Sequence, residues 1–347
     1  MRSAIPNIVP PGGFSRSADS FVKASFAVTR NFRISRRARS VTSSVTPKCF
    51  REKKGYMDLR IKLSLVTVAV LTLGFASPQT SNRPPAPARE TYADLPGVRI
   101  WFRDTGGSGI PVVFMHAATG SSRNWDNQIP VFTAAGYRFI AYDRRGWGRS
   151  VSDPAGSPPG TAADDLQGLM NYLNVDRFHL VGTAAGGFVS LDYALSFPQR
   201  LRSVVIANSI VGVQDEDYLE LGRRLRPPQF DALPPEIREL GPSYRAANAE
   251  GTRRWVELQR LSRPEGPPAP AQTFRNRMTF SLLETIKVPT LLLTGDADMY
   301  APPPLVPLFK ARIKNSESLI VPEAGHSSYW EKPEVFNRAV LDFIRKH

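Results

Sequence analysis

Residues 178–187 read FHLVGTAAGG, and this stretch decides the fold. Phe178–Val181, which is apolar except for His179, predicts a strand that is buried inside a sheet. Three glycines lie among the next six residues, and glycine permits a tight turn at which two backbone segments approach closely. A helix is predicted directly afterwards, over Ala185–Ser196. The stretch therefore predicts a strand, a tight turn and a helix.

The alternation of strand and helix continues on both sides of this stretch. Thr161 is the expected N-cap of one helix, with Asp164 three residues further on. Alternation with short loops predicts the α/β class, with a doubly wound, mostly parallel sheet. Strands are predicted over 98–103, 112–115, 139–142, 204–207, 290–293 and 318–321, and helices over 125–135, 161–173 and 333–345.

The alternation stops between about residues 212 and 281. This interval contains nine prolines and no run that predicts a strand, so we expect an irregular, mainly helical insertion. Its aromatic residues are expected to line an apolar pocket wall or to form the core of the insertion itself. These residues are Tyr218, Phe230, Tyr244 and Trp255.

The formal net charge of +14 belongs mainly to the N-terminal part of the chain. Residues 1–76 contain 14 of the 45 Lys and Arg residues and three of the 31 acidic residues, so the body carries a nearly balanced 31 basic and 28 acidic residues. Nucleic-acid binding requires a basic surface. We therefore expect no nucleic-acid partner.

Cysteine and histidine are too scarce in the body for several kinds of site. The single cysteine, Cys49, lies in the N-terminal part, which excludes a disulfide, a Cys-ligated zinc site and a Cys nucleophile further along. The four histidines are scattered, so no metal site is predicted. No Gly-rich phosphate-binding motif occurs, and no cofactor is predicted.

Residues 57–76 have the three parts of a secretory signal peptide. Arg60 and Lys62 form a basic region, Leu63–Phe75 is a mostly apolar run, and small residues precede the expected cleavage after Ala76. Thirteen helical residues cover ~20 Å, less than the ~30 Å hydrocarbon core of a bilayer. We therefore expect export to the periplasm or secretion, and no stable membrane span after cleavage.

The segments beside this signal carry further expectations. Residues 1–56 are rich in Arg and Ser, and we interpret them as a non-native or disordered extension, with Met57 as the true first residue. An organelle transit peptide is the alternative. Residues 77–91 are Pro-rich and predict a disordered linker. The folded domain is then expected over 92–347.

Four further texts accompany the tight turn. They are VVFMHAATGSSRNW (112–125), DRRGWGRS (143–150), LLLTGDADMYAPPP (291–304) and PEAGHSSYW (322–330). In this order around a strand, turn and helix, they resemble the α/β-hydrolase family from about Gly97 to the C-terminus. The resemblance implies a mostly parallel, doubly wound sheet, with the insertion at 212–281 as its helical cap.

The tight turn departs from the family pattern at one position. The nucleophile elbow of the family is G-x-S-x-G, a turn that lifts a serine hydroxyl above the sheet. Here the turn has Ala184 where the serine is expected, although its glycines are present. The resemblance therefore implies a degenerate catalytic triad without its nucleophile.

The resemblance assigns the remaining roles residue by residue. His326 is the expected base, and Asp298 is expected to orient it, with Asp296 as a weaker alternative. The backbone N–H groups of Ala117 and Ala185 are expected to form the oxyanion hole.

Other histidines and hydroxyl groups are weaker candidates. His116 is expected to support the oxyanion loop, whereas His179 lies in a predicted strand and His347 at the end of the chain. Replacement of the nucleophile by another hydroxyl group is the less favoured alternative. The candidates are Thr183, Thr119, Ser121 and Ser122.

Two classes of function follow from these residues. The first is an enzyme in which His326 and Asp298 activate water, or deprotonate the substrate, while the oxyanion hole stabilises negative charge. It would hydrolyse a small ester, lactone or related carbonyl substrate, or act as a lyase. The second is a non-catalytic protein that binds a small molecule or signals. A base with an orienting carboxylate favours the enzyme, because a pure binder needs neither.

Overall fold

The computed structural model describes residues 88–152, 160–209, 211–226, 228–263 and 272–347. The chain divides into two units, 1–77 and 78–347, and every described residue belongs to the second. The predicted extension, the predicted signal peptide and most of the predicted linker lie outside the described residues. Within the described ranges, no helix is both long and apolar enough to cross a membrane.

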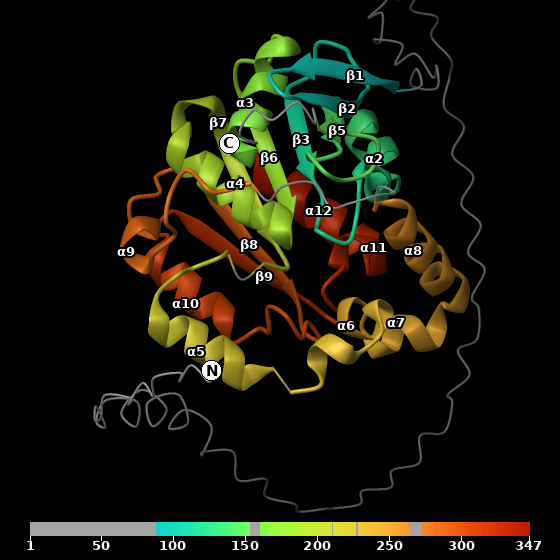
Figure 1. Ribbon diagram of the computed structural model, residues 1–347, viewed down its shortest axis with the longest axis vertical. Coiled ribbons are helices and arrows are strands. Elements are labelled where there is room, and N and C mark those ends of the chain that lie inside the picture. Colours follow the sequence, from blue (N-terminus) through green and yellow to red (C-terminus); the bar gives the residue numbers. More distant parts are fainter. Residues whose placement is uncertain (1–87, 153–159, 210, 227, 264–271) are drawn as a thin grey trace, which may run out of the picture. The chain divides into compact units, whose positions relative to one another are not determined.

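The described part of the chain is built on one nine-stranded sheet (Figure 1). Its main path runs β1-β2-β4-β3-β6-β7-β8-β9, and the short β5 pairs with β2. Neighbouring strands from β4 to β9 are parallel, whereas β2 pairs antiparallel with β1, β4 and β5. The strands are β1 (Arg89–Leu95), β2 (Val98–Asp104), β3 (Pro111–Met115), β4 (Arg138–Tyr142), β5 (Val151–Ser152), β6 (Phe178–Thr183), β7 (Leu201–Ala207), β8 (Thr290–Gly295) and β9 (Ser316–Val321). The predicted fold class is confirmed.

Helices cover both faces of this sheet. They are α2 (Ile129–Ala134), α3 (Ala162–Tyr172), α4 (Ala185–Ser196), α5 (Glu216–Leu225), α6 (Pro235–Glu239), α7 (Pro242–Ala247), α8 (Ala249–Leu261), α9 (Phe280–Leu283), α10 (Leu305–Arg312), α11 (Ser328–Glu331) and α12 (Pro333–Ile344). Helices α5 to α9 fill the interval between β7 and β8, where the sequence predicts the helical cap. The bounds 212–281 of the cap stay a prediction.

Both faces of the strand β6 pack against core residues, which explains its mostly apolar sequence. Phe178 and Leu180 belong to a core cluster that includes Leu166 of α3, while Val181 belongs to a second cluster that includes Phe336 of α12. Side chains of a strand alternate between its two faces. Because both faces of β6 are covered, every residue of this strand is buried.

Two sequence predictions are wrong in detail. Residues 89–91 of the predicted linker belong to β1, where Glu90 forms an ion pair with Arg103 of β2. The charged residues of this edge strand, Arg89, Glu90 and Asp94, left no apolar pattern that predicts a strand. The helix predicted over 125–135 is a short 3₁₀-helix, Ser122–Trp125, followed by α2 from Ile129. Pro130 suits the first turn of α2 and not the interior of a longer helix.

Candidate active site

Ala184 occupies a sharp turn between β6 and α4. Its backbone angles are φ 50° and ψ −117°, a conformation that costs energy for a residue other than glycine. The turn is held from three sides: Ala184 N–H donates to the Ala207 carbonyl (2.9 Å), and its own carbonyl accepts from Gly187 N–H (2.9 Å) and the Ser209 hydroxyl (2.8 Å). A strained turn between strand and helix is thus present, as predicted from the sequence, with the Ala184 methyl group at its tip.

Glycines beside Ala184 let neighbouring backbone segments approach. A Cβ atom on Gly182 would lie 2.5 Å from the Gly186 carbonyl oxygen, and one on Gly186 would lie 2.4 Å from the Met115 carbonyl oxygen. Neither position has room for a side chain. The turn therefore packs directly against the end of β3, where the predicted oxyanion loop begins.

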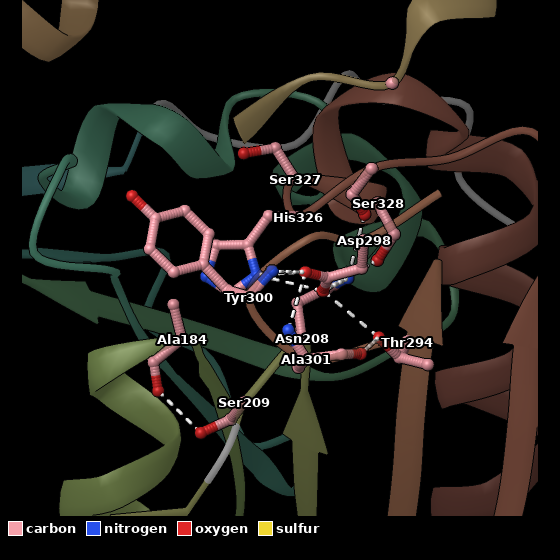
Figure 2. Close-up of polar contacts among 12 residues, drawn as sticks. Ala184, Asn208, Ser209, Thr294, Asp298, Tyr300, Ala301, His326, Ser327 and Ser328 are labelled. Carbon is pink, nitrogen blue, oxygen red and sulfur yellow. Dashed lines mark hydrogen bonds and ion pairs between the residues drawn. The ribbon is translucent and has the colours of Figure 1, made fainter. Parts of the chain in front are cut away.

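His326 and Asp298 form a buried pair opposite this turn (Figure 2). Both carboxylate oxygens of Asp298 lie 2.9 Å from Nδ1 of His326. A carboxylate can only accept, so Nδ1 of His326 carries the hydrogen and the neutral ring keeps a lone pair on Nε2. Figure 2 shows the Ala184 side chain pointing toward the part of the site where His326 and Tyr300 lie. The predicted base and its orienting carboxylate are thus brought together.

The Asp298 carboxylate is held by a full set of donors. Its Oδ1 accepts the N–H groups of Tyr300 and Ala301, each at 2.8 Å. Its Oδ2 accepts from the Asn208 amide and the Thr294 hydroxyl, each at 3.1 Å. These bonds fix the carboxylate, which in turn fixes the imidazole ring.

Burial and mutual charge act in opposite directions on this pair. Burial alone would raise the pKa of Asp298, but the charge and hydrogen bond of His326, together with the hydrogen bonds from Ala301 and Asn208, hold that pKa below its usual range. Burial would likewise lower the pKa of His326, yet Asp298 raises that pKa above the usual histidine value. The Asp298 carboxylate therefore stabilises the imidazolium that forms when His326 takes up a proton.

Asn208 is a site residue that the sequence did not reveal. It follows β7 directly, has φ 49°, and is buried. Besides Asp298, its amide donates to the Gly325 carbonyl at 3.0 Å, and its amide oxygen accepts from the Ser328 hydroxyl. Asn208 therefore ties the carboxylate to the loop that carries His326. No sequence motif distinguishes this Asn from any other Asn that follows an apolar strand.

Tyr300 is a second residue that sequence reasoning missed. Its ring lies against the His326 imidazole, with the ring centroids 4.4 Å apart and the planes tilted by 36°. The Arg226 guanidinium lies 5.5 Å from the centroid of the Tyr300 ring. The aromatic contact covers one side of the imidazole and limits the positions that the ring can take.

His116 holds the backbone of the loop after β3, in which we predict an oxyanion donor. Its Nδ1 lies 2.7 Å from the Ala117 carbonyl, which it must donate to, and its Nε2 accepts the Arg144 N–H at 2.9 Å. Burial, followed by the Arg144 charge, holds the pKa of His116 well below its usual value. A neutral His116 thus fixes the backbone around Ala117.

The two predicted oxyanion donors stand at the ends of adjacent strands. Ala117 follows β3 and Ala185 begins α4 after β6, and β3 pairs with β6 through Met115 and Gly182. Parallel strands carry their carboxyl ends to the same edge of a sheet. The oxyanion role of these N–H groups stays a prediction.

The remaining candidates lie elsewhere or serve the fold. Asp296 is exposed, whereas Asp298 is 3% exposed and bonded to His326. Nδ1 of His179 lies 2.8 Å from the Ser203 hydroxyl, and burial lowers the pKa of His179 to about 4. Thr183 is buried in β6. Among the described residues, no group of three or more His, Cys, Asp or Glu side chains could hold a metal ion.

Comparison with known proteins finds a matching family model and similar sequences. Residues 112–339 match the model of the Alpha/beta hydrolase family. A 2-hydroxy-6-oxononadienedioate/2-hydroxy-6-oxononatrienedioate hydrolase of Burkholderia vietnamiensis is 27% identical over 277 residues, which cover 72% of this chain and 92% of that protein. A putative non-heme bromoperoxidase, BpoC, of Mycobacterium tuberculosis is 28% identical over 260 residues, which cover 70% of this chain and 96% of that protein.

Solved structures show the same fold. A thermophilic esterase from Thermogutta terrifontis superposes with a TM-score of 0.62 and 27% identity, covering 75% of this chain and 99% of that chain. The enol-lactonase of Burkholderia xenovorans superposes with a TM-score of 0.58 and 20% identity, covering 73% and 99% of the two chains. The second likeness is one of fold alone.

Proposed function

The chain belongs to the α/β-hydrolase family, and we propose that it hydrolyses a small ester, lactone or related carbonyl substrate by direct attack of water. The observation that carries the proposal is the buried pair of His326 and Asp298 opposite a strained turn whose tip is Ala184. A histidine that is held in one orientation by a carboxylate is suited to proton transfer. Ala184 has no hydroxyl group, so the tip of the turn cannot form a covalent intermediate.

The reaction begins with water held near Ala184. His326 Nε2 takes a proton from this water while the oxygen attacks the substrate carbonyl, and Asp298 stabilises the imidazolium that forms. The N–H groups of Ala117 and Ala185 donate hydrogen bonds to the negatively charged oxygen of the tetrahedral intermediate. Its collapse breaks the bond to the leaving oxygen, which receives a proton, and releases the acid.

The relatives support a carbonyl substrate. One is named a hydrolase of a hydroxy-oxo dienedioate and another, a solved structure at 27% identity, is an esterase. Loss of a serine nucleophile costs a working triad on the order of 10⁶ in rate, and the oxyanion hole with substrate binding retains ~10³–10⁴ over water. We therefore propose a slower, water-dependent member of the family.

We also propose that the protein acts outside the cytoplasm, in the periplasm or as a secreted protein. This rests on the basic, apolar and small-residue pattern of 57–76. The substrate would then be a small molecule available in that compartment.

The test compares the purified protein with three variants on a panel of small esters and lactones. Hydrolysis should be lost in His326→Ala and strongly reduced in Asp298→Asn. Asp296→Asn is the matched control because Asp296 lies two residues away and is exposed; it should keep the activity. A protein that binds these compounds but hydrolyses none faster than His326→Ala would be the non-catalytic binder.

A further inference from the structure

Glu239 is a buried carboxyl group that the proposed reaction leaves without a role. It is the last residue of α6, between β7 and β8, and is 4% exposed. Among the described residues, its Oε2 has no hydrogen-bond partner. Buried polar atoms are almost always paired, so an unpaired carboxyl oxygen at this depth indicates a place for a ligand or a reacting group.

The backbone of Glu239 lies against the loop that carries the base. A Cβ atom on Gly325 would lie 2.4 Å from the Gly241 nitrogen and 2.9 Å from the Glu239 carbonyl oxygen. The Gly241 N–H donates to Oε2 of Glu331 at 2.7 Å, and Glu331 also accepts the N–H groups of Gly325 (3.0 Å) and Ser327 (3.2 Å). One carboxylate therefore joins the segment of Glu239 to both neighbours of His326.

The charged groups around Glu239 are those of the site. Burial raises the pKa of Glu239 most, the His326 charge and Arg238 lower that pKa in part, the Asp298 charge raises it, and a hydrogen bond from Thr119 lowers it. The Glu239 charge in turn raises the pKa values of His326, Tyr300 and Tyr329. Glu239 therefore shares one electrostatic environment with the base, the tyrosine that covers it and the oxyanion loop.

We propose that Glu239 is the catalytic acid of this site and protonates the leaving oxygen, an inference that rests on the proposed function. In a serine-dependent triad the histidine takes and returns the proton. Here the two tasks are divided between His326 and Glu239. The division favours substrates with an alkoxide leaving group, such as alkyl esters and lactones, because a poor leaving group depends most on protonation.

The step balances as follows. His326 removes one proton from water, and the hydroxide oxygen forms the new bond to the carbonyl carbon. When the tetrahedral intermediate collapses, its bond to the leaving oxygen breaks and that oxygen takes the proton of the Glu239 carboxyl group. The imidazolium of His326 then returns a proton, through water, to Glu239. The sum is ester plus water giving acid plus alcohol.

The test measures kcat/KM for acetate esters whose leaving alcohols run from p-nitrophenol to ethanol. Glu239→Gln keeps the shape of the side chain and removes the acid. We expect its loss to grow along the series, to about 10²-fold or more for the ethyl ester. Glu236→Gln, on the same helix, is the control and should match the parent. Glu239→Asp should recover part of the activity on the ethyl ester.

The outcomes separate this inference from the function that it rests on. Absence of any His326-dependent hydrolysis would overturn both. Hydrolysis in the parent together with an equal loss, or none, across the ester series in Glu239→Gln would overturn the role of Glu239 alone. If Glu239→Gln folds poorly, Glu239→Asp serves instead. It should lose more activity on the ethyl ester than on the p-nitrophenyl ester, and an equal loss on both would contradict the proposal.

Discussion

Nδ1 of His326 lies 2.9 Å from both carboxylate oxygens of Asp298. The pair is buried, braced by Asn208, and stands opposite an elbow that ends in Ala184. The histidine and the carboxylate that we propose as base and orienting group are therefore assembled beside a turn that has Ala184 at its tip. The predictions below start from this arrangement.

The pH dependence of hydrolysis should report the His326–Asp298 pair. His326 must be neutral to take a proton, and Asp298 raises the pKa of His326 above its ordinary value of 6.5. For an activated ester, whose leaving group needs no acid, we therefore expect kcat/KM to rise with pH through an apparent pKa above 6.5. Asp298→Asn removes the raising charge, so the same limb should move to lower pH while the rate falls. A limb that does not move in this variant would separate Asp298 from the base.

Ala184→Ser should complete a triad with His326 and Asp298. The change adds one oxygen at the tip of the turn, whose backbone Ala184 already holds. We expect a gain of about 10²-fold or more on an activated ester, since each tenfold corresponds to ~1.4 kcal/mol of barrier. Intact mass should show a phosphonate adduct on this variant and none on the double variant with His326→Ala. A folded variant that forms no adduct would place His326 or the oxyanion amides out of reach.

Glu331 should contribute to the stability of the loop around His326. Its carboxylate accepts three backbone N–H groups, from Gly241, Gly325 and Ser327, and the side chain is buried. Glu331→Ala leaves those donors unpaired, and we expect the free energy of unfolding to fall by about 3 kcal/mol. Glu334→Ala, at an exposed position three residues later, is the control and should stay within about 0.5 kcal/mol. Urea denaturation of both variants distinguishes these values, and equal stabilities would refute the role.

Export can be tested on the intact chain expressed in a bacterium. The pattern of 57–76 predicts cleavage after Ala76, so the protein outside the cytoplasm should begin at Ser77. Mass spectrometry of the N-terminus decides this. Recovery of residues 1–56 on the native protein would contradict both the prediction of export and the interpretation of Met57 as the first residue.

The sequence predicted the parts of the site that lie in contiguous motifs. The elbow, His326 and Asp298 each follow a strand within a recognisable text, and parallel strands bring their carboxyl ends together. Asn208, Tyr300 and Glu239 lie far apart along the chain, and their roles depend on contacts that only the fold creates. No spacing rule marks them.

The same contrast between local sequence patterns and long-range contacts explains which strands could be predicted. Strands that are buried inside the sheet, such as β3 with Val112–Met115, have uninterrupted apolar runs and were predicted. The edge strand β1 has one fully buried residue, Ala93, among charged and half-exposed neighbours, so its sequence resembled a linker. Its pairing with β2 stabilises it, and pairing with a distant segment cannot be read from local composition.

The most direct test of hydrolysis without a serine nucleophile combines labelling by a serine-directed inhibitor with a measurement of the hydrolysis rate. The unaltered protein is incubated with a fluorophosphonate, its intact mass is recorded, and hydrolysis of its best ester or lactone is then measured beside His326→Ala. We predict no added mass, unchanged hydrolysis in the treated protein, and loss of hydrolysis in His326→Ala. A phosphonate adduct with loss of activity would reveal a hydroxyl nucleophile elsewhere. Equal rates with and without His326 would contradict the account.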